Sequence, residues 1–416
     1  MEISREKLNE QYKKEIVLFE QTHKKSGELF RKAHDSMQRG VPMCWMERWA
    51  GSYPLFVESA KGAHFQDVDG NDYIDFCLGD TGSMIGHATE PVAKVISEYV
   101  KNVGTTFLLP TEDCIWVSEE LQRRFGMKYW QYSTSATDAN RNALRMAREV
   151  TGRQYILIYN WSYHGSVDET VAEIGPDGSV VPKIGSLGPP VHPKLTTRVI
   201  EWNDIAALED ALKDRQVAAV LAEPTMSNCG IVHPIPGYLD ALRALTKKYG
   251  TILIFDETHT ISAGPGGCIK AYGLSPDMVV LGKTLAGGIP SGAYGYTEEI
   301  AEASVIRDIP KELSDLGGTG GTLAANALTM AAMKVTLSEM LTEKAYERNI
   351  KLAARFNEDV QKVIVNLNYR GIRRSSGAGV STGLRKSLRL MEGKAKARGT
   401  SSLTFIPIWR VQTAVY

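Results

Sequence analysis

The chain has 416 residues, of which 43% are hydrophobic and 23% charged, so its composition is that of a globular protein with room for one large domain and a smaller one. Lys and Arg together number 48, as do Asp and Glu, and this balance argues against nucleic acid or an anionic membrane as a partner. Five scattered cysteines without a CxxC pair, a polar amino terminus and no apolar run of about 18 residues predict a cytoplasmic protein without a disulfide framework, metal cluster or membrane span.

The first 75 residues predict helix followed by a small antiparallel hairpin. Residues 4–38 are charged, and their apolar residues recur at helical spacing, at Leu8, Tyr12, Ile16 and Phe19. Residues 63–76 alternate around Asp69-Gly70, which is a strong signal for a tight turn.

Four continuous apolar runs punctuate the next part of the chain, between about residues 90 and 335. They are 155–159, 217–222, 251–255 and 278–281, with helical patterns between them. Such runs are typical of strands buried on both faces of a parallel sheet. We therefore predict an α/β fold with a large domain at 76–335, and a small α+β domain built from residues 1–75 and 336–416.

Chemically useful side chains follow these four strands. Tyr163 comes after the first, Glu223 after the second, Asp256 after the third and Lys283 after the fourth. Ligands of open α/β sheets gather at the carboxyl ends of the strands. The sequence therefore predicts that one edge of the sheet collects an aromatic ring, two acids and a lysine.

Lys283 is the most informative of these residues. It lies just past a buried strand in a glycine-rich stretch, 281–288, where a solvated surface charge is poorly placed. A lysine in such a place can act as a neutral amine, forming imines and moving protons. A nucleotide P-loop is disfavoured because position 277, where that motif needs glycine, is Asp; a structural ion pair remains an alternative.

Asp256 would complement that lysine. A carboxylate at the end of an apolar strand is costly without a partner, and a protonated pyridine nitrogen is one. The alternative is a carboxylate that caps a helix at 256–258. Likewise, 133–139 carries small hydroxyl residues before a helical segment, as a phosphate site at a helix N-terminus would, although ordinary N-capping explains the same pattern. Tyr163 would either stack on a planar cofactor or belong to the core.

Eight short motifs in collinear order resemble the class III aminotransferase family of pyridoxal-phosphate enzymes, and among its members the glutamate-1-semialdehyde aminomutases. Each is weak alone, but together they are specific, and they span roughly residues 38–335. They are DVDGNDYID at 67–75, Gly86-His87, SATDA at 135–139, YHG at 163–165, EPTMSN at 223–228, FDE at 255–257, LGKTLAGGIP at 281–290 and GTLAAN at 321–326.

The resemblance implies the fold type I of pyridoxal-phosphate transferases, pyridoxal 5'-phosphate as cofactor and a homodimer. It implies that Lys283 carries the cofactor as an imine and moves protons, and that Asp256 pairs with the pyridine nitrogen. The other implied cofactor contacts are Tyr163 on the ring, Glu223, Asn228 and His259 near the ring oxygen, Ser135, Ala136 and Thr137 at the phosphate, and Thr322 at the phosphate of the neighbouring subunit.

Two departures from the family pattern shape the functional prediction. Where the aminomutases carry an arginine for the substrate carboxylate, this chain has Cys44 to Met46, with Arg48 shifted and Trp45 and Trp49 nearby. We therefore expect an aminotransferase between an amine or amino acid and a keto or aldehyde acceptor, with Trp45, Arg48 and Trp49 as tentative substrate contacts. Internal amino transfer of the aminomutase type is the alternative.

The second departure is the carboxyl-terminal stretch. Residues 367–416 hold ten Lys/Arg and one acid, Glu392, and the small-domain pattern ends at about residue 366. This suggests an out-of-frame or replaced terminus, and so a non-catalytic, frame-damaged relative as a further alternative. A basic tail that binds an anionic partner is the other explanation.

Overall fold

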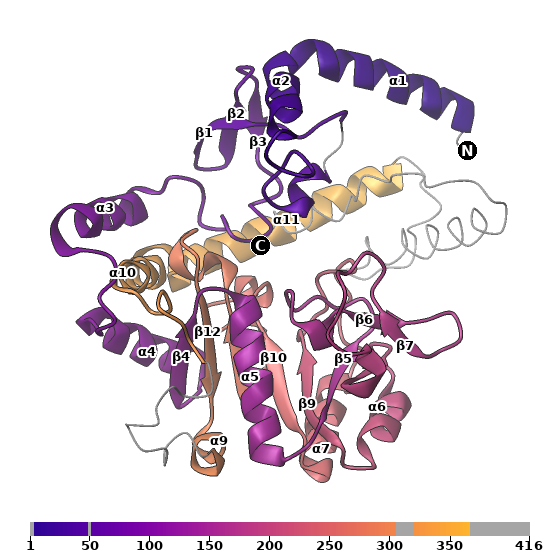
Figure 1. Cartoon of the computed structure of the whole chain (residues 1–416), viewed down its shortest axis with the longest axis vertical. Coiled ribbons are helices and arrows are strands. Elements are labelled where there is room, and N and C mark those ends of the chain that lie inside the picture. The colour runs from indigo at the N-terminus through magenta and orange to yellow at the C-terminus, as the bar shows by residue number, and fades with distance from the viewer. Residues whose placement is uncertain (1–3, 49–50, 305–318, 367–416) are drawn as a thin grey trace. The chain divides into compact units, whose positions relative to one another are not determined.

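The computed structural model describes residues 4–48, 51–304 and 319–366 (Figure 1). The basic stretch after residue 366 and the predicted substrate contact Trp49 lie outside these ranges. The described chain divides into two compact units. The first comprises residues up to Leu78 together with Gly86–Thr89, and the second comprises Gly79–Ile85 and the chain from Glu90 onward.

The first unit contains two helices and a three-stranded antiparallel sheet. These are α1 (Arg5–Thr22), α2 (Lys24–Ala33), β1 (Val57–Lys61), β2 (His64–Asp67) and β3 (Asp72–Ile74), in the sheet order β1-β2-β3. The predicted hairpin is present, and Gly70 adopts φ 88° in its turn, a conformation that favours glycine.

The single helix predicted for residues 4–38 is wrong, because the chain breaks at His23. His23 has φ −127° and ψ 42°, outside the helical region. The amides of Lys25 and Ser26 donate instead to the carboxylate of Asp69, at 2.7 and 3.0 Å, so the hairpin turn caps a new helix. A contact made 43 positions away thus overrides a local helical pattern.

The second unit is built on a seven-stranded sheet with the order β4-β12-β11-β10-β9-β5-β8 (Figure 1). Only β12 runs antiparallel to its neighbours. The strands are β4 (Tyr129–Ser133), β5 (Tyr155–Tyr159), β8 (Thr197–Ile200), β9 (Val217–Ala222), β10 (Ile252–Asp256), β11 (Met278–Leu281) and β12 (Gly292–Tyr296), and a separate hairpin pairs β6 (Ala172–Ile174) with β7 (Val180–Pro182). The predicted α/β architecture with a mostly parallel sheet is confirmed.

Helices cover both faces of this sheet. Alternate strand residues belong to two cores: Leu157, Val220 and Phe255 face one, while Ile156, Leu221 and Ile254 face the other. The α-helices described in this unit are α3 (Glu90–Glu98), α4 (Glu112–Phe125), α5 (Ala136–Thr151), α6 (Ile205–Leu212), α7 (Tyr238–Tyr249), α8 (Gly267–Tyr272), α9 (Glu298–Ala303), α10 (Ala327–Val335) and α11 (Glu343–Asn366), of which α5 packs directly on several strands. Burial on both faces explains why these strands have continuous apolar sequences.

Three of the four predicted strands have the predicted bounds, and the fourth is shifted by one residue. Strand β10 ends at Asp256 because that residue still pairs with Val280 of β11. The Asp256 side chain is therefore fixed by the sheet itself. No helix in the described parts of the chain is long and apolar enough to cross a membrane.

Candidate active site

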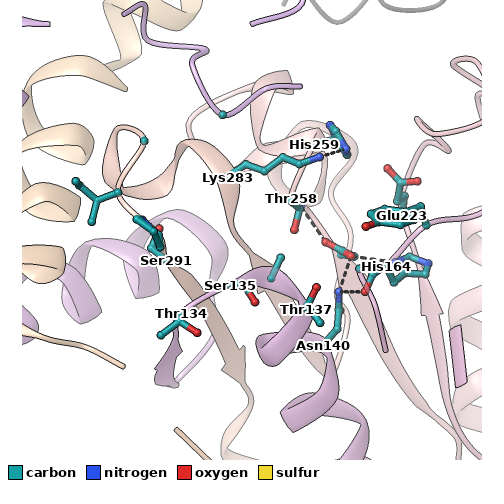
Figure 2. Close-up of a pocket in the computed structure, with 18 residues that line it drawn as sticks. Thr134, Ser135, Thr137, Asn140, His164, Glu223, Thr258, His259, Lys283 and Ser291 are labelled. Atoms are coloured by element: carbon teal, nitrogen blue, oxygen red, sulfur yellow. Dashed lines mark hydrogen bonds and ion pairs between the residues drawn. The ribbon is translucent and has the colours of Figure 1, made fainter. Parts of the chain in front are cut away.

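A cavity of about 410 Å³ opens at the carboxyl edge of the parallel strands. Figure 2 shows side chains from several strand ends pointing toward it. Such a volume suits a cofactor-sized ligand. Its lining comes entirely from the second unit: Gly82, Thr134, Ser135, Ala136, Thr137, Asn140, Tyr163, His164, Gly165, Glu223, Asp256, Thr258, His259, Lys283, Gly288, Ile289, Pro290 and Ser291.

Most of the predicted site residues therefore line one cavity, including Lys283 and Asp256. Four of those in the described ranges do not line it. Asn228 lies in the turn after β9, where it bridges to Gly230, and Thr322 is exposed in the turn before α10. Trp45 and Arg48 belong to the first unit, where the Arg48 guanidinium lies 4.7 Å from the centre of the Trp45 ring.

Asp256 is a buried carboxylate held by three donors. His164 Nδ1 and Asn140 Nδ2 each lie 2.9 Å from its Oδ2, and the Thr258 amide donates to Oδ1 at 3.1 Å (Figure 2). Burial by itself raises the pKa of the Asp256 carboxyl, but these hydrogen bonds outweigh it and bring the pKa to about 2. The cavity wall thus keeps a permanent negative charge.

A second acid in the wall, Glu223, behaves in the opposite way. It follows β9 and is 3% exposed, with the amide of Ser227 as a donor at 3.2 Å. Burial raises the pKa of its carboxyl to about 7, which the hydrogen bonds from Ser227 only partly offset. Glu223 is therefore a group that exchanges a proton near neutral pH.

Lys283 reaches into the cavity from the turn after β11. Its Nζ lies 3.0 Å from Oδ2 of Asp80 and 2.5 Å from Nε2 of His259. The preceding residue must be small, because a Cβ added to Gly282 would come within 2.7 Å of the Ala136 side chain. This close approach brings the turn that carries the lysine against the start of α5.

The ring of His259 lies between the lysine amine and a threonine hydroxyl. Its Nδ1 lies 2.9 Å from Oγ1 of Thr81, which leaves Nε2 free of hydrogen and directed at Lys283 when Nδ1 carries the proton. Burial, followed by the positive charge of Lys283, lowers the pKa of His259. The imidazole is therefore neutral near pH 7.

The start of α5 forms the floor of the cavity. Ser135 caps this 16-residue helix, accepting from the Asp138 amide at 3.2 Å, and its carbonyl approaches Gly292 so closely that an added Cβ there would lie 2.2 Å away. Gly165, at φ 81°, also needs to be glycine, because an added Cβ would lie 2.1 Å from Thr137 Oγ1. The N-terminal amides and positive dipole end of a long helix suit a phosphate group.

Buried polar atoms in the wall support a fit to a polar, planar cofactor such as pyridoxal phosphate. Thr258 Oγ1, Ser291 Oγ and His164 Nε2 are buried and make no hydrogen bond within the described protein. Such atoms are costly unless a ligand or water satisfies them. Together with the ionised Asp256, the amine of Lys283 and the start of α5, they match the chemistry of a ring nitrogen, an aldehyde and a phosphate.

Several of these residues were not predicted from the sequence. Asp80 and Thr81 carried no periodic or motif signal, although the spacing Gly79-Asp-Thr-Gly82 marks a tight turn. His164 was visible inside the YHG motif without an assigned role. Asn140 and Ser291 became apparent only from the register of α5 and β12 with the central strands.

Comparison with known proteins places the chain in one class. The family model described as aminotransferase class-III matches residues 45–398. A glutamate-1-semialdehyde 2,1-aminomutase from Desulfitobacterium hafniense is 34% identical over 355 residues, which cover 83% of this chain and 80% of the relative. A crystal structure of a glutamate-1-semialdehyde-aminomutase from Pseudomonas aeruginosa PAO1 matches with 43% identity and a TM-score of 0.86, over 91% of this chain and 84% of that one.

The chain therefore belongs to the class III aminotransferase family. A variant of the same Pseudomonas protein is described in complex with PMP, and an omega-transaminase from Sphaerobacter thermophilus matches with 29% identity and a TM-score of 0.75, over 82% of this chain and 78% of that one. The predictions of family, fold class and a pyridoxal-phosphate-dependent enzyme are confirmed. The family match also extends past residue 335, where the motif resemblance ends.

Proposed function

We propose that this protein catalyses internal amino transfer of the glutamate-1-semialdehyde 2,1-aminomutase type. The observation that carries the proposal is that Lys283 and Asp256 line the same cavity as the start of α5. The sequence favoured amino transfer between two separate substrates, but the Desulfitobacterium and Pseudomonas relatives described above bear the aminomutase name. These relatives support internal amino transfer over transfer between two substrates.

The residues of the cavity would divide the cofactor between them. Asp256 would face the pyridine nitrogen, Tyr163 the ring, Glu223 and His259 the ring oxygen, and Ser135, Ala136 and Thr137 the phosphate. Bound pyridoxal phosphate supplies an electron sink for the bond broken at the substrate carbon. Asn228 and, in a homodimer, Thr322 of the neighbouring copy remain proposed contacts of the cofactor. A location in the cytoplasm also remains a proposal.

Lys283 would move the proton. Its Nζ donates to Asp80 and lies 2.5 Å from Nε2 of His259, so the amine is held between a charged partner and a neutral one. A general acid–base must lie within hydrogen-bond reach of the proton that it moves. His259 would keep Lys283 oriented when the lysine is free, because its Nε2 accepts only while the imidazole is neutral.

Transfer between two substrates is the second candidate, and one observation favours it. Among the described residues that line the cavity, Lys283 is the only lysine or arginine, so none of them offers a guanidinium to a substrate carboxylate. This agrees with the replacement of the aminomutase arginine by Cys44 to Met46. Trp45, Arg48 and Trp49 remain proposed substrate contacts.

Incubation with glutamate-1-semialdehyde separates the two candidates. We expect its isomer, with the amino group on carbon 1, to form without any added amino donor or acceptor, and not to form with Lys283→Ala. Conversion only when a second amino or keto compound is present would establish the two-substrate reaction instead. If pyridoxal phosphate fails to raise the melting temperature, the frame-damaged alternative is correct, because a ligand of the native state must stabilise it.

A further inference from the structure

Asp80 is a carboxylate beside the reacting amine, and the mechanism above uses it only to hold that amine. Its Oδ2 lies 3.0 Å from Lys283 Nζ, although the two residues are 203 positions apart in the sequence. Its side chain is 44% exposed, whereas that of Asp256 is 5% exposed. Of these two acids, Asp80 is the one that an entering ligand can reach.

The backbone holds Asp80 in this place at a cost. Gly79, Asp80 and Thr81 have φ values of 53°, 58° and 78°, and such values are rare for a β-branched residue like Thr81. Each strained residue costs on the order of 1–3 kcal/mol and persists only where other contacts fix it. Here Thr81 is buried and hydrogen-bonded to the ring of His259, which fixes the turn. The preceding residue, Asp80, is thereby held beside the Lys283 amine.

The surroundings of Asp80 favour a cation. Burial and then the negative charge of Asp80 raise the pKa of the Tyr163 phenol, so an aromatic ring lies within electrostatic range of the same carboxylate. The wall described above contributes two further acids, Glu223 and Asp256, against the single cationic side chain of Lys283. A carboxylate next to an aromatic ring is a common arrangement for binding an ammonium group.

We propose that Asp80 is a specificity-determining residue that binds an ammonium group on the substrate carbon next to the reacting carbon. With Lys283 bonded to the cofactor, as the proposed function requires, its ion pair with Asp80 is no longer made, and the substrate ammonium takes its place against the Asp80 carboxylate. The substrate class is then vicinal amino aldehydes and vicinal diamines. This proposal rests on the proposed function, because internal transfer requires nitrogen on two neighbouring carbons.

The rival explanation is that Asp80 serves only to hold the Lys283 amine. In that case its loss would weaken the binding of every amine by the same factor. A pair of ligands that differ only in the second group separates the two explanations: 1,2-diaminopropane carries an amine where 1-amino-2-propanol carries a neutral hydroxyl.

The test is an absorbance titration of the holoenzyme with both ligands, which reports amine binding and needs no turnover. We expect the half-maximal concentration of the diamine to be lower by about tenfold or more, the value of a hydrogen bond to a charged group. Asp80→Asn should bring the ratio to within about twofold of one, and Asp80→Glu should restore part of it. Asp210→Asn, the same change at an exposed carboxylate of α6, is the matched control and should keep the ratio.

A ratio near one in the unmodified enzyme, or an unchanged ratio in Asp80→Asn, would overturn the proposal. The first of these outcomes needs no variant, so a variant that folds poorly cannot hide the answer. Together with the isomerisation assay, the titration tests the aminomutase assignment and the role of Asp80 separately. A diamine preference without isomerisation of glutamate-1-semialdehyde would defeat the aminomutase assignment alone, whereas isomerisation without the preference would defeat the role of Asp80 alone.

Discussion

Asp256 and Lys283 line the same cavity, but the protein holds the two groups differently. Asp256 ends a central strand, is buried, and receives three hydrogen bonds from neighbouring segments. Lys283 lies in a turn at φ 50°, is 22% exposed, and contacts two residues whose own positions depend on a strained turn. The carboxylate side therefore suits a charge that stays fixed, and the amine side suits a group that changes partners.

Removal of the Lys283 amine should have the largest effect of the changes that test this contrast. We expect Lys283→Ala to lower amino transfer by about 10³-fold or more, because both the nucleophile and the proton carrier are lost. Initial rates and trapping of the cofactor by borohydride measure this. Lys248→Ala, on the exposed face of α7, is the control and should remain within about twofold of the parent. Comparable activity in the two variants would remove Lys283 from the mechanism.

The proton-exchanging acid on the cavity wall should produce a pH dependence of stability. The pKa of Glu223 is raised in the folded state to about 7 from an ordinary 4.5, so its stabilising contribution is complete below about pH 4.5 and is lost as the pH rises through 7. The loss amounts to about 3 kcal/mol. Urea unfolding of cofactor-free Glu223→Gln and parent at pH 5 and pH 7.5 tests this: the variant should lose less stability on going to pH 7.5. Parallel pH profiles would contradict it.

Loss of one hydrogen-bond donor to Asp256 should lower the stability of the folded protein. In His164→Phe the carboxylate keeps Asn140 and the Thr258 amide but loses the imidazole, which we expect to lower the free energy of unfolding by about 1.5–3 kcal/mol. Equilibrium urea unfolding near pH 7 measures this. An unchanged free energy would mean that the imidazole contributes no net stability to the buried carboxylate.

The smallest effect is expected from a change beside the Lys283 amine, at Thr81. Thr81→Val keeps a β-branched residue at φ 78°, so the backbone strain is unchanged and only the hydroxyl contact to His259 is lost. We expect a loss of about 1 kcal/mol in the free energy of unfolding. A loss as large as that of His164→Phe would show that the two sides are held equally firmly, against the contrast drawn above.

The sequence predicted the parts of this site that depend on strand ends. Buried strands have apolar runs, so the positions of Glu223, Asp256 and Lys283 followed from where those runs stop, and the collinear motifs added Ser135 to Thr137 and Tyr163. Asp80, Thr81 and Asn140 could not be found in this way. Their place depends on how a turn and a helix face meet strands far away in the chain, and no local spacing encodes that.

The break at His23 shows the same limit in the first unit. The spacing of Leu8, Tyr12, Ile16 and Phe19 correctly predicted helix, but not its end, because the acceptor that starts the next helix is Asp69 of the hairpin. Strand β10 departed by one residue for a related reason, since pairing with β11 extends it to Asp256.

The reversed strand β12 has a consequence for how this enzyme can change. Because β12 returns directly beside β11, one stretch of ten residues, 282–291, carries Lys283 at its start and Ser291 at its end, and both face the same cavity. An insertion here would displace the reactive amine and the opposite wall together. Lengthening of the segments after β5 or β9 would shift only one wall, so new substrates are more easily accommodated by variation there.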